Sequence, residues 1–210
     1  DLVLVGVERA AAADDADLSR RLWMRAAAMH DEKRGAVDAA VAAFGKILEK
    51  EPADSEVLDA LEALYRRAAA TDPARWRELL GVLRKKVELS SDGAVQEQLL
   101  AQMADIHEEL LGEPSQAVAL YREVLELDPT SKNALGALDR LFEKQEMWSD
   151  LADNIGRQLT LADGAEEQTA LQLRLAALRE SRMNGAESAI EIHREILERE
   201  ASNEAALGAL

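Results

Sequence analysis

An all-α array of stacked helix pairs is the fold class that this 210-residue sequence predicts, from three observations. The chain repeats itself: segments 117–138 (AVALYREVLELDPTSKNALGAL) and 189–210 (AIEIHREILEREASNEAALGAL) are identical at 10 of 22 positions without a gap. Segment 40–61 fits the same frame, so the three copies begin at Ala40, Ala117 and Ala189. Apolar residues recur at helical spacing, with no strand pattern. Such repeats are typical of α-solenoids, in which each helix pair buries its apolar face against its neighbours.

Prolines and glycines divide the sequence into about twelve predicted helices. Pro52 and Pro129 follow helical runs, while Pro73 and Pro114 stand at first-turn positions, where a missing N–H costs nothing. Glycines between the periodic segments indicate turns. The predicted helices lie near residues 2–12, 17–32, 36–50, 55–70, 74–89, 94–111, 115–127, 132–145, 147–162, 165–182, 186–199 and 203–210.

The two ends of the chain favour an array that is longer than the sequence. In the repeat frame, residues 2–12 correspond to only the later part of the helix at 74–89. Residue 210 falls inside a helix whose counterpart continues to Gln145. Solenoids need polar capping repeats, and neither end resembles one. We therefore expect residues 1–210 to be a single solenoid segment within a longer array, built of double-hairpin units of about 72–77 residues.

Composition argues against several functional classes. The formal net charge is −16, whereas binding to a phosphate backbone needs clustered Lys and Arg, so nucleic acid is not an expected partner. No apolar run reaches the roughly 18 residues of a membrane span, and residues 1–15 lack a basic region and cleavage site, so no membrane insertion is expected. The absence of cysteine excludes disulfides and thiolate metal sites but leaves both cytoplasm and periplasm open.

Small residues recur at fixed places in one set of helix pairs, as the pairs Ala27/Ala40, Ala104/Ala117 and Ala176/Ala189. This pattern resembles the tetratricopeptide repeat (TPR) family, in which helix A carries a small residue at position 8 and large residues at 4, 7 and 11. Helix B of that family carries a small residue at position 20 and an aromatic residue at 24. The resemblance implies a right-handed solenoid of antiparallel hairpins whose helices approach closely at the small pairs. A related helical-hairpin repeat would fit the same residues.

The other set of hairpins departs from the family pattern at the same two positions. Position 8 is Glu62 or Asp139, where the family prefers Gly, and position 20 is Leu79 or Leu151, where it prefers Ala. We expect these hairpins to be splayed more widely. In the first set, two extra residues precede the turn glycine, so the spacing of hairpins alternates between about 34 and 38 residues.

The three histidines favour packing over chemistry. His30 and His107 occupy position 11, and His193 occupies position 24, where the repeat holds aromatic residues. The sequence HEELL lacks the second histidine of a zinc helix, and no nucleophile–base grouping or phosphate loop is found. We therefore expect no catalytic, cofactor-binding or metal-binding residues. The rival hypothesis of an enzyme would require a buried cavity with convergent polar groups and strongly shifted carboxylates.

The remaining candidate site is the concave face that the TPR resemblance implies, lined by helix A positions 2, 5, 9, 12 and 13. One interpretation is a groove that clamps a peptide through its cations. The other is that these cations pair with Asp31, Glu32, Glu108 and Glu109 on neighbouring A helices and only set the register of the repeats, which satisfies both signs of charge without a ligand. The candidate groove residues are Arg66, Arg67, Arg140, Lys144, Asp105, Glu108, Glu109 and Asn133.

The function that the resemblance implies is a non-catalytic scaffold that presents a helical groove to a peptide or protein partner, without a cofactor. Similar arrays occur in large bacterial proteins of surface, secretion or gliding-motility machineries. The alternative is a sensor or regulatory arm of a larger signalling or transcription-regulating protein, which an adjoining catalytic or DNA-binding domain would favour.

Overall fold

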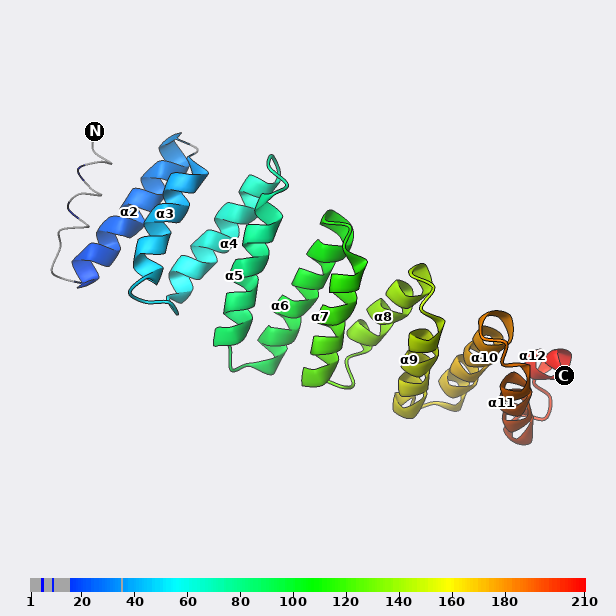
Figure 1. Ribbon diagram of the computed structural model, residues 1–210. Helices are drawn as coiled ribbons and strands as arrows, with labels where there is room; N and C mark the ends of the chain where they lie inside the picture. The colour runs from blue at the N-terminus through cyan, green and yellow to red at the C-terminus, as the bar shows by residue number, and fades with distance from the viewer. Residues whose placement is uncertain (1–4, 6–8, 10–15, 35) are drawn as a thin grey trace. The chain divides into compact units, whose positions relative to one another are not determined.

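The computed structural model describes residues 5, 9, 16–34 and 36–210, and every regular element in this part of the chain is helical (Figure 1). The helix predicted near residues 2–12 falls almost entirely outside the described residues. The helices are α2 (Ala16–Arg34), α3 (Val37–Leu48), α4 (Ser55–Ala69), α5 (Arg75–Leu89), α6 (Gly93–Asp105) with the π-helical segment η1 (Ile106–Leu110), α7 (Pro114–Leu127), α8 (Lys132–Lys144), α9 (Trp148–Leu161), α10 (Ala165–Arg182), α11 (Ala186–Arg199) and α12 (Glu204–Ala209).

The chain forms two compact units, Asp1–Glu113 and Pro114–Leu210. In unit 1, α2 packs on α3, α3 on α4, α4 on α5, and α5 on α6 and η1. In unit 2, each helix from α7 to α11 likewise packs on the helix that follows it. Contacts between consecutive helices are what an array of hairpins requires. The all-α hairpin arrangement that the sequence predicts is confirmed in each unit.

Small residues fill the hairpin cores of the first set. In unit 1, Ala27 of α2 and Ala40 of α3 are completely buried. In unit 2, Ala176 of α10 and Ala189 of α11 are no more than 2% exposed. A methyl side chain lets two helix backbones approach closely, so a larger residue at these positions would have no space.

The extra residues of the first set are absorbed where its A helices end. These helices are α2, α6 with η1, and α10. In each of them, the carbonyl oxygen at position 11 accepts a hydrogen bond from the backbone N–H six positions further along the chain. The contacts are Ala36 to His30 (3.0 Å), Glu113 to His107 (2.7 Å) and Gly185 to Arg179 (2.9 Å). The three carbonyls stand at the same place in successive copies of the repeat, so the three helices share this terminal hydrogen bond.

Two turn residues with positive φ complete these helix ends. Gly112 has φ 66°, and Asn184, its equivalent in the next copy of the repeat, has φ 51°. The left-handed conformation suits glycine because it has no Cβ, and asparagine tolerates it better than most residues. After α6 the helical turns become wider before the C-terminal turn is reached, because η1 is π-helical and its i to i+5 hydrogen bonds accommodate an extra residue.

Candidate functional site

The candidate groove residues fall into two sets, one in each unit. Unit 1 contains Arg66 and Arg67 in the last turn of α4, Asp105 at the end of α6, and Glu108 and Glu109 in η1. Unit 2 contains Asn133, Arg140 and Lys144, which are all exposed on α8. The surface that the first helices of the hairpins form in a unit is called its A-helix face below; α2, α4 and α6 form it in unit 1, and α8 and α10 in unit 2.

Arg67 and Arg66 connect α4 to its two neighbours on the A-helix face of unit 1. Arg67, which is 61% exposed, forms an ion pair with Asp31 of α2, one of the pairings that the register interpretation names. Arg66, which is 40% exposed, donates to Glu62 of its own helix (2.9 and 3.1 Å) and to Gln102 of α6 (2.6 Å). An i, i+4 pair within one helix forms locally, so Glu62 is the carboxylate nearest to Arg66.

Glu108 does not lie where the repeat frame placed it. The frame put its side chain on the exposed concave surface, but only 9% of Glu108 is exposed, while its neighbour Glu109 is exposed. Each residue added to a helix rotates the following side chains by about 100° around the axis. The π-helical segment adds such a residue, which accounts for the inward position of Glu108.

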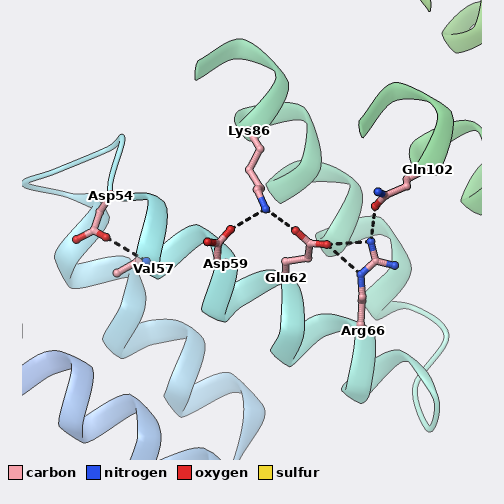
Figure 2. Close-up of polar contacts among 7 residues, drawn as sticks. All are labelled: Asp54, Val57, Asp59, Glu62, Arg66, Lys86 and Gln102. Atoms are coloured by element: carbon pink, nitrogen blue, oxygen red, sulfur yellow. Dashed lines mark hydrogen bonds and ion pairs between the residues drawn. The ribbon is translucent and has the colours of Figure 1, made fainter. Parts of the chain in front are cut away.

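A chain of polar contacts joins α4, α5 and α6 on this face (Figure 2). The Lys86 ammonium of α5 donates to Asp59 (2.7 Å) and to Glu62 (2.6 Å) of α4. Glu62 also accepts from Arg66, whose guanidinium reaches Gln102 of α6. Five side chains from three helices therefore form one network, with Glu62 at its centre.

The network keeps its charges despite partial burial. The side chains of Glu62 and Lys86 are 19% and 24% exposed. Burial by itself would raise the pKa of Glu62, but hydrogen bonds from Lys86 and Arg66 outweigh it, and the pKa is lowered from its ordinary value. Burial would likewise lower the pKa of Lys86, but its bonds to Asp59 and Glu62 raise it. Both groups are therefore charged at neutral pH.

A second network surrounds Asp139 on the A-helix face of unit 2. The Asp139 carboxylate accepts from Asn154 (2.8 Å) and Gln158 (2.9 Å) of α9, and from Arg174 of α10. Asn154 also donates to the backbone carbonyl of Leu135 (2.8 Å). Asp139 and Asn154 are both buried, so these bonds satisfy groups that water does not reach.

The two networks occupy the same repeat positions. Each has a carboxylate at position 8, a donor at one shared position of the following B helix and one polar side chain on the next A helix; Asn154 is a second B-helix donor that only unit 2 has. In the repeat frame the equivalent residues are Glu62 and Asp139, Lys86 and Gln158, and Gln102 and Arg174. The cation stands on the B helix in unit 1 and on the next A helix in unit 2, and the amide takes the other place. Of these residues, the sequence had indicated only Glu62 and Asp139, which depart from the family preference for Gly at position 8.

The start of α4 is also tied to α2. Asp54 caps α4 by accepting from the backbone N–H of Val57 (3.1 Å). The Arg20 guanidinium of α2 donates to Asp54 (3.1 Å) and to Glu56 (2.6 Å), and this contact holds the pKa of Asp54 below its ordinary value. Together with the ion pair of Arg67, these bonds hold both ends of α4 against α2, which fixes the direction in which its exposed side chains project.

Two of the three histidines, His193 and His107, occupy a packed and a paired position. His193 is 6% exposed at its aromatic repeat position. Nδ1 of His107 lies 2.9 Å from Glu113, which also accepts from Arg77 (2.6 Å), and both contacts lower the pKa of Glu113. Within residues 16–34 and 36–210, no cluster of three or more His, Asp or Glu side chains is arranged to hold a metal ion. In the same part of the chain, no helix is both long enough and apolar enough to cross a membrane.

The order of the hairpins, their buried alanine pairs and their shared terminal hydrogen bond define an all-α helical-repeat protein. No family model and no curated protein matches the chain. Among solved structures, it is similar to MamA, with 16% identity, a TM-score of 0.43, and coverage of 88% of this chain and 95% of that chain. It is also similar to YrrB, described as a TPR protein with an unusual peptide-binding site (13% identity, TM-score 0.43, 100% and 97% coverage). A tetratricopeptide repeat protein from Parabacteroides merdae has 16% identity and a TM-score of 0.44 over 90% of this chain and 70% of its own.

Proposed function

We propose that this chain is a non-catalytic scaffold for protein–protein interaction, and that the cations on its A-helix faces bind an acidic segment of a partner protein. The observation that carries the proposal is the exposure of Arg66 and Arg67 beside each other at the end of α4. On α8, the equivalent helix of unit 2, Lys144 lies in the last turn and Arg140 one turn earlier, and both have the same role in the proposal. Components of bacterial surface, secretion or motility assemblies are the partners that the resemblance suggests.

The bonds that orient these arginines also set the strength of binding. Exposed ion pairs contribute only about 0.2 to 1 kcal/mol, so a partner carboxylate can replace Asp31 beside Arg67 at small cost. It can also add to Arg66, whose guanidinium carries five donors, of which Glu62 and Gln102 use only a part. Because a ligand must compete with these internal partners, we expect weak binding that falls as ionic strength rises.

A titration with an acidic probe tests the proposal. The full chain is titrated with a fluorescent twelve-residue peptide of alternating Glu and Ser, and with its Gln counterpart, at low and raised salt. We expect the Glu peptide to bind more tightly, and Arg67→Glu to weaken binding by about 5-fold or more. Arg194→Glu is the matched control, because Arg194 is exposed on the B helix α11 and the substitution changes the net charge equally. Equal losses in the two variants, or unchanged binding by Arg67→Glu, would contradict the proposal.

A further inference from the structure

Unit 2 contains a cleft of about 430 Å³ among α7, α8 and α9. Leu125 of α7 and Leu138 and Phe142 of α8 contribute its apolar lining, and the other side chains are charged or polar residues of α7 and α9. Residues spaced by three and four positions share one face of a helix, so each of these two helices presents its charges along the cleft. The volume lies within the range of roughly 300 to 1,000 Å³ in which proteins bind small ligands and single side chains.

Arg122 shows which kind of group the cleft accepts. Its guanidinium forms an ion pair with Asp150 of α9 and lies over the ring of Phe142, 5.5 Å from the centroid. A cation held between a carboxylate and an aromatic face is the arrangement in which proteins recognise arginine and lysine side chains. The cleft thus already surrounds one guanidinium, which belongs to its own α7.

The remaining charges of the cleft are mainly acidic. Glu126 of α7 and Asp153 of α9 are exposed carboxylates, and neither side chain has a hydrogen-bond or ion-pair partner within the described part of the chain. Arg157 of α9 is an exposed cation with no such partner in the same residues. Two unsatisfied carboxylates against one guanidinium, on a chain of net charge −16, favour a cationic ligand and repel an acidic one.

Two of the charged positions of the cleft carry no charge in unit 1. In unit 1 the positions equivalent to Arg122 and Asp153 in the repeat frame are Gly45 and Gly81. Around both glycines there is open space where a Cβ would stand. Since α3 and α5 form without side chains at these positions, the repeat itself does not require Arg122 or Asp153. Arg122 joins α7 to α9 through its ion pair with Asp150, whereas the Asp153 side chain has no such partner in the described residues and is available for binding.

We infer that the cleft among α7, α8 and α9 is a docking site for a cationic segment of a partner protein, whose arginine or lysine side chain inserts between Glu126 and Asp153. The partner is recognised by a positive charge with an aliphatic stem, which contacts the apolar lining beside the Arg122 guanidinium. This site differs from the A-helix faces in the sign of its ligand, so it does not depend on the acidic-segment proposal.

Fluorescence anisotropy with a defined probe tests the inference. The probe is a labelled nine-residue peptide with three arginines separated by serines, and its counterpart carries citrulline, which has nearly the same shape without the charge. We expect the full chain to bind the arginine peptide more tightly. The double variant Glu126→Gln/Asp153→Asn should weaken binding by about 5-fold, and Arg157→Gln should strengthen it by about 2-fold because a competing cation is removed.

The matched control is Glu180→Gln/Asp163→Asn, which removes the same charge from two exposed acids of unit 2 that do not line the cleft. Its binding should fall by less than about 2-fold. An equal loss in the control, equal binding of the two peptides, or unchanged binding by the cleft variant would each overturn the inference. Melting curves of the cleft variant should match those of the original chain, since its altered side chains have no partners in the described residues.

Discussion

The Glu62 network of unit 1 and the Asp139 network of unit 2 place a carboxylate at the same repeat position but neutralise it from different helices. In unit 1 the cations are Lys86, on the B helix of the same hairpin, and Arg66, on the same helix as Glu62. In unit 2 Gln158 takes the place of Lys86, and the cation is Arg174, on the next A helix. The comparison shows that both units place an acid at position 8 with an amide and a cation near it, while the helix that supplies the cation differs.

The two networks differ in how much water reaches them. The Glu62 side chain is 19% exposed, whereas the Asp139 side chain is 10% exposed. Asp139 also receives a bond from Asn154, whose unit 1 equivalent is Val82. A buried donor that loses its acceptor costs more than an exposed cation that turns to solvent. We therefore expect the Asp139 network to contribute more to stability than the Glu62 network.

Removal of the two carboxylates is the largest expected effect. Asp139→Ala should lower the free energy of unfolding by about 2 to 3 kcal/mol, because the buried amide of Asn154 loses an acceptor and Arg174 its partner. Glu62→Ala should cost about 1 kcal/mol, since Lys86 keeps Asp59 and Arg66 keeps Gln102. Urea denaturation measures both values. If Glu62→Ala lowered the free energy of unfolding as much as Asp139→Ala, the greater burial of Asp139 would not make its network the more stabilising one.

Moving the cation of unit 2 from the A helix α10 to the B helix α9 tests whether either helix can supply it. Arg174→Gln should cost about 1 to 2 kcal/mol, because Asp139 is left as a buried carboxylate without a cation. Adding Gln158→Lys places a cation where unit 1 has Lys86, so the double variant should recover at least half of the loss. A double-mutant cycle by urea denaturation gives the coupling. Additive losses would mean that the two positions are not interchangeable.

The reverse exchange in unit 1 should have a smaller effect. Lys86→Gln should cost about 0.5 to 1 kcal/mol, because Arg66 still neutralises Glu62. Gln102→Arg should compensate for it only in part, since Arg66 already points to this position and a second guanidinium there is repelled. The same denaturation assay checks both variants, and full recovery by Gln102→Arg would contradict this account.

The fold could be predicted from the sequence because the helical periodicity and the repeat extend along nearly the whole chain. The predicted helix at 132–145 and the observed α8 (Lys132–Lys144) differ by one residue, since turn residues fix its ends. The alanine pairs could be recognised because small residues that recur at fixed repeat positions indicate places where two helices approach closely. The extra residues before Gly112 were visible as a change in spacing, but spacing alone could not distinguish a loop from the π-helical segment.

The site could be predicted only in part. The repeat frame identified Arg66 and Arg67 as exposed, and it named Asp31 as a partner of these cations. It did not find Lys86, because Lys86 stands on a B helix, outside the positions that line the face in the family. Gln102 carries no charge, so no charge pattern connects it to Arg66. Both contacts join residues 24 and 36 positions apart, which only the packed structure brings together.

The contribution of Glu62 to the stability of unit 1 should depend on pH. Its pKa is lowered in the folded state, so its contribution to stability is present above the ordinary value of 4.5 and is lost as pH falls through the folded pKa. The free-energy difference between the original chain and Glu62→Gln should therefore be largest near pH 6 and should shrink below pH 4.5. Its maximum should stay below about 1 kcal/mol, because solvent screens the partly exposed partners. A difference independent of pH would mean that the Glu62 charge does not stabilise the folded state.

The exposed pair between Arg67 and Asp31 should have the smallest effect on stability. Arg67→Ala is expected to cost no more than about 0.5 kcal/mol, because both groups regain water when they separate and salt screens their attraction. Arg20→Ala at the other end of α4 should cost more, about 1 kcal/mol, since it holds the cap residue Asp54, whose side chain is only 5% exposed. Urea denaturation at low and raised salt compares the two variants. If Arg67→Ala were the more costly, the arginine would be a structural part of the array, and an acidic partner could not take it from Asp31 without loosening α4.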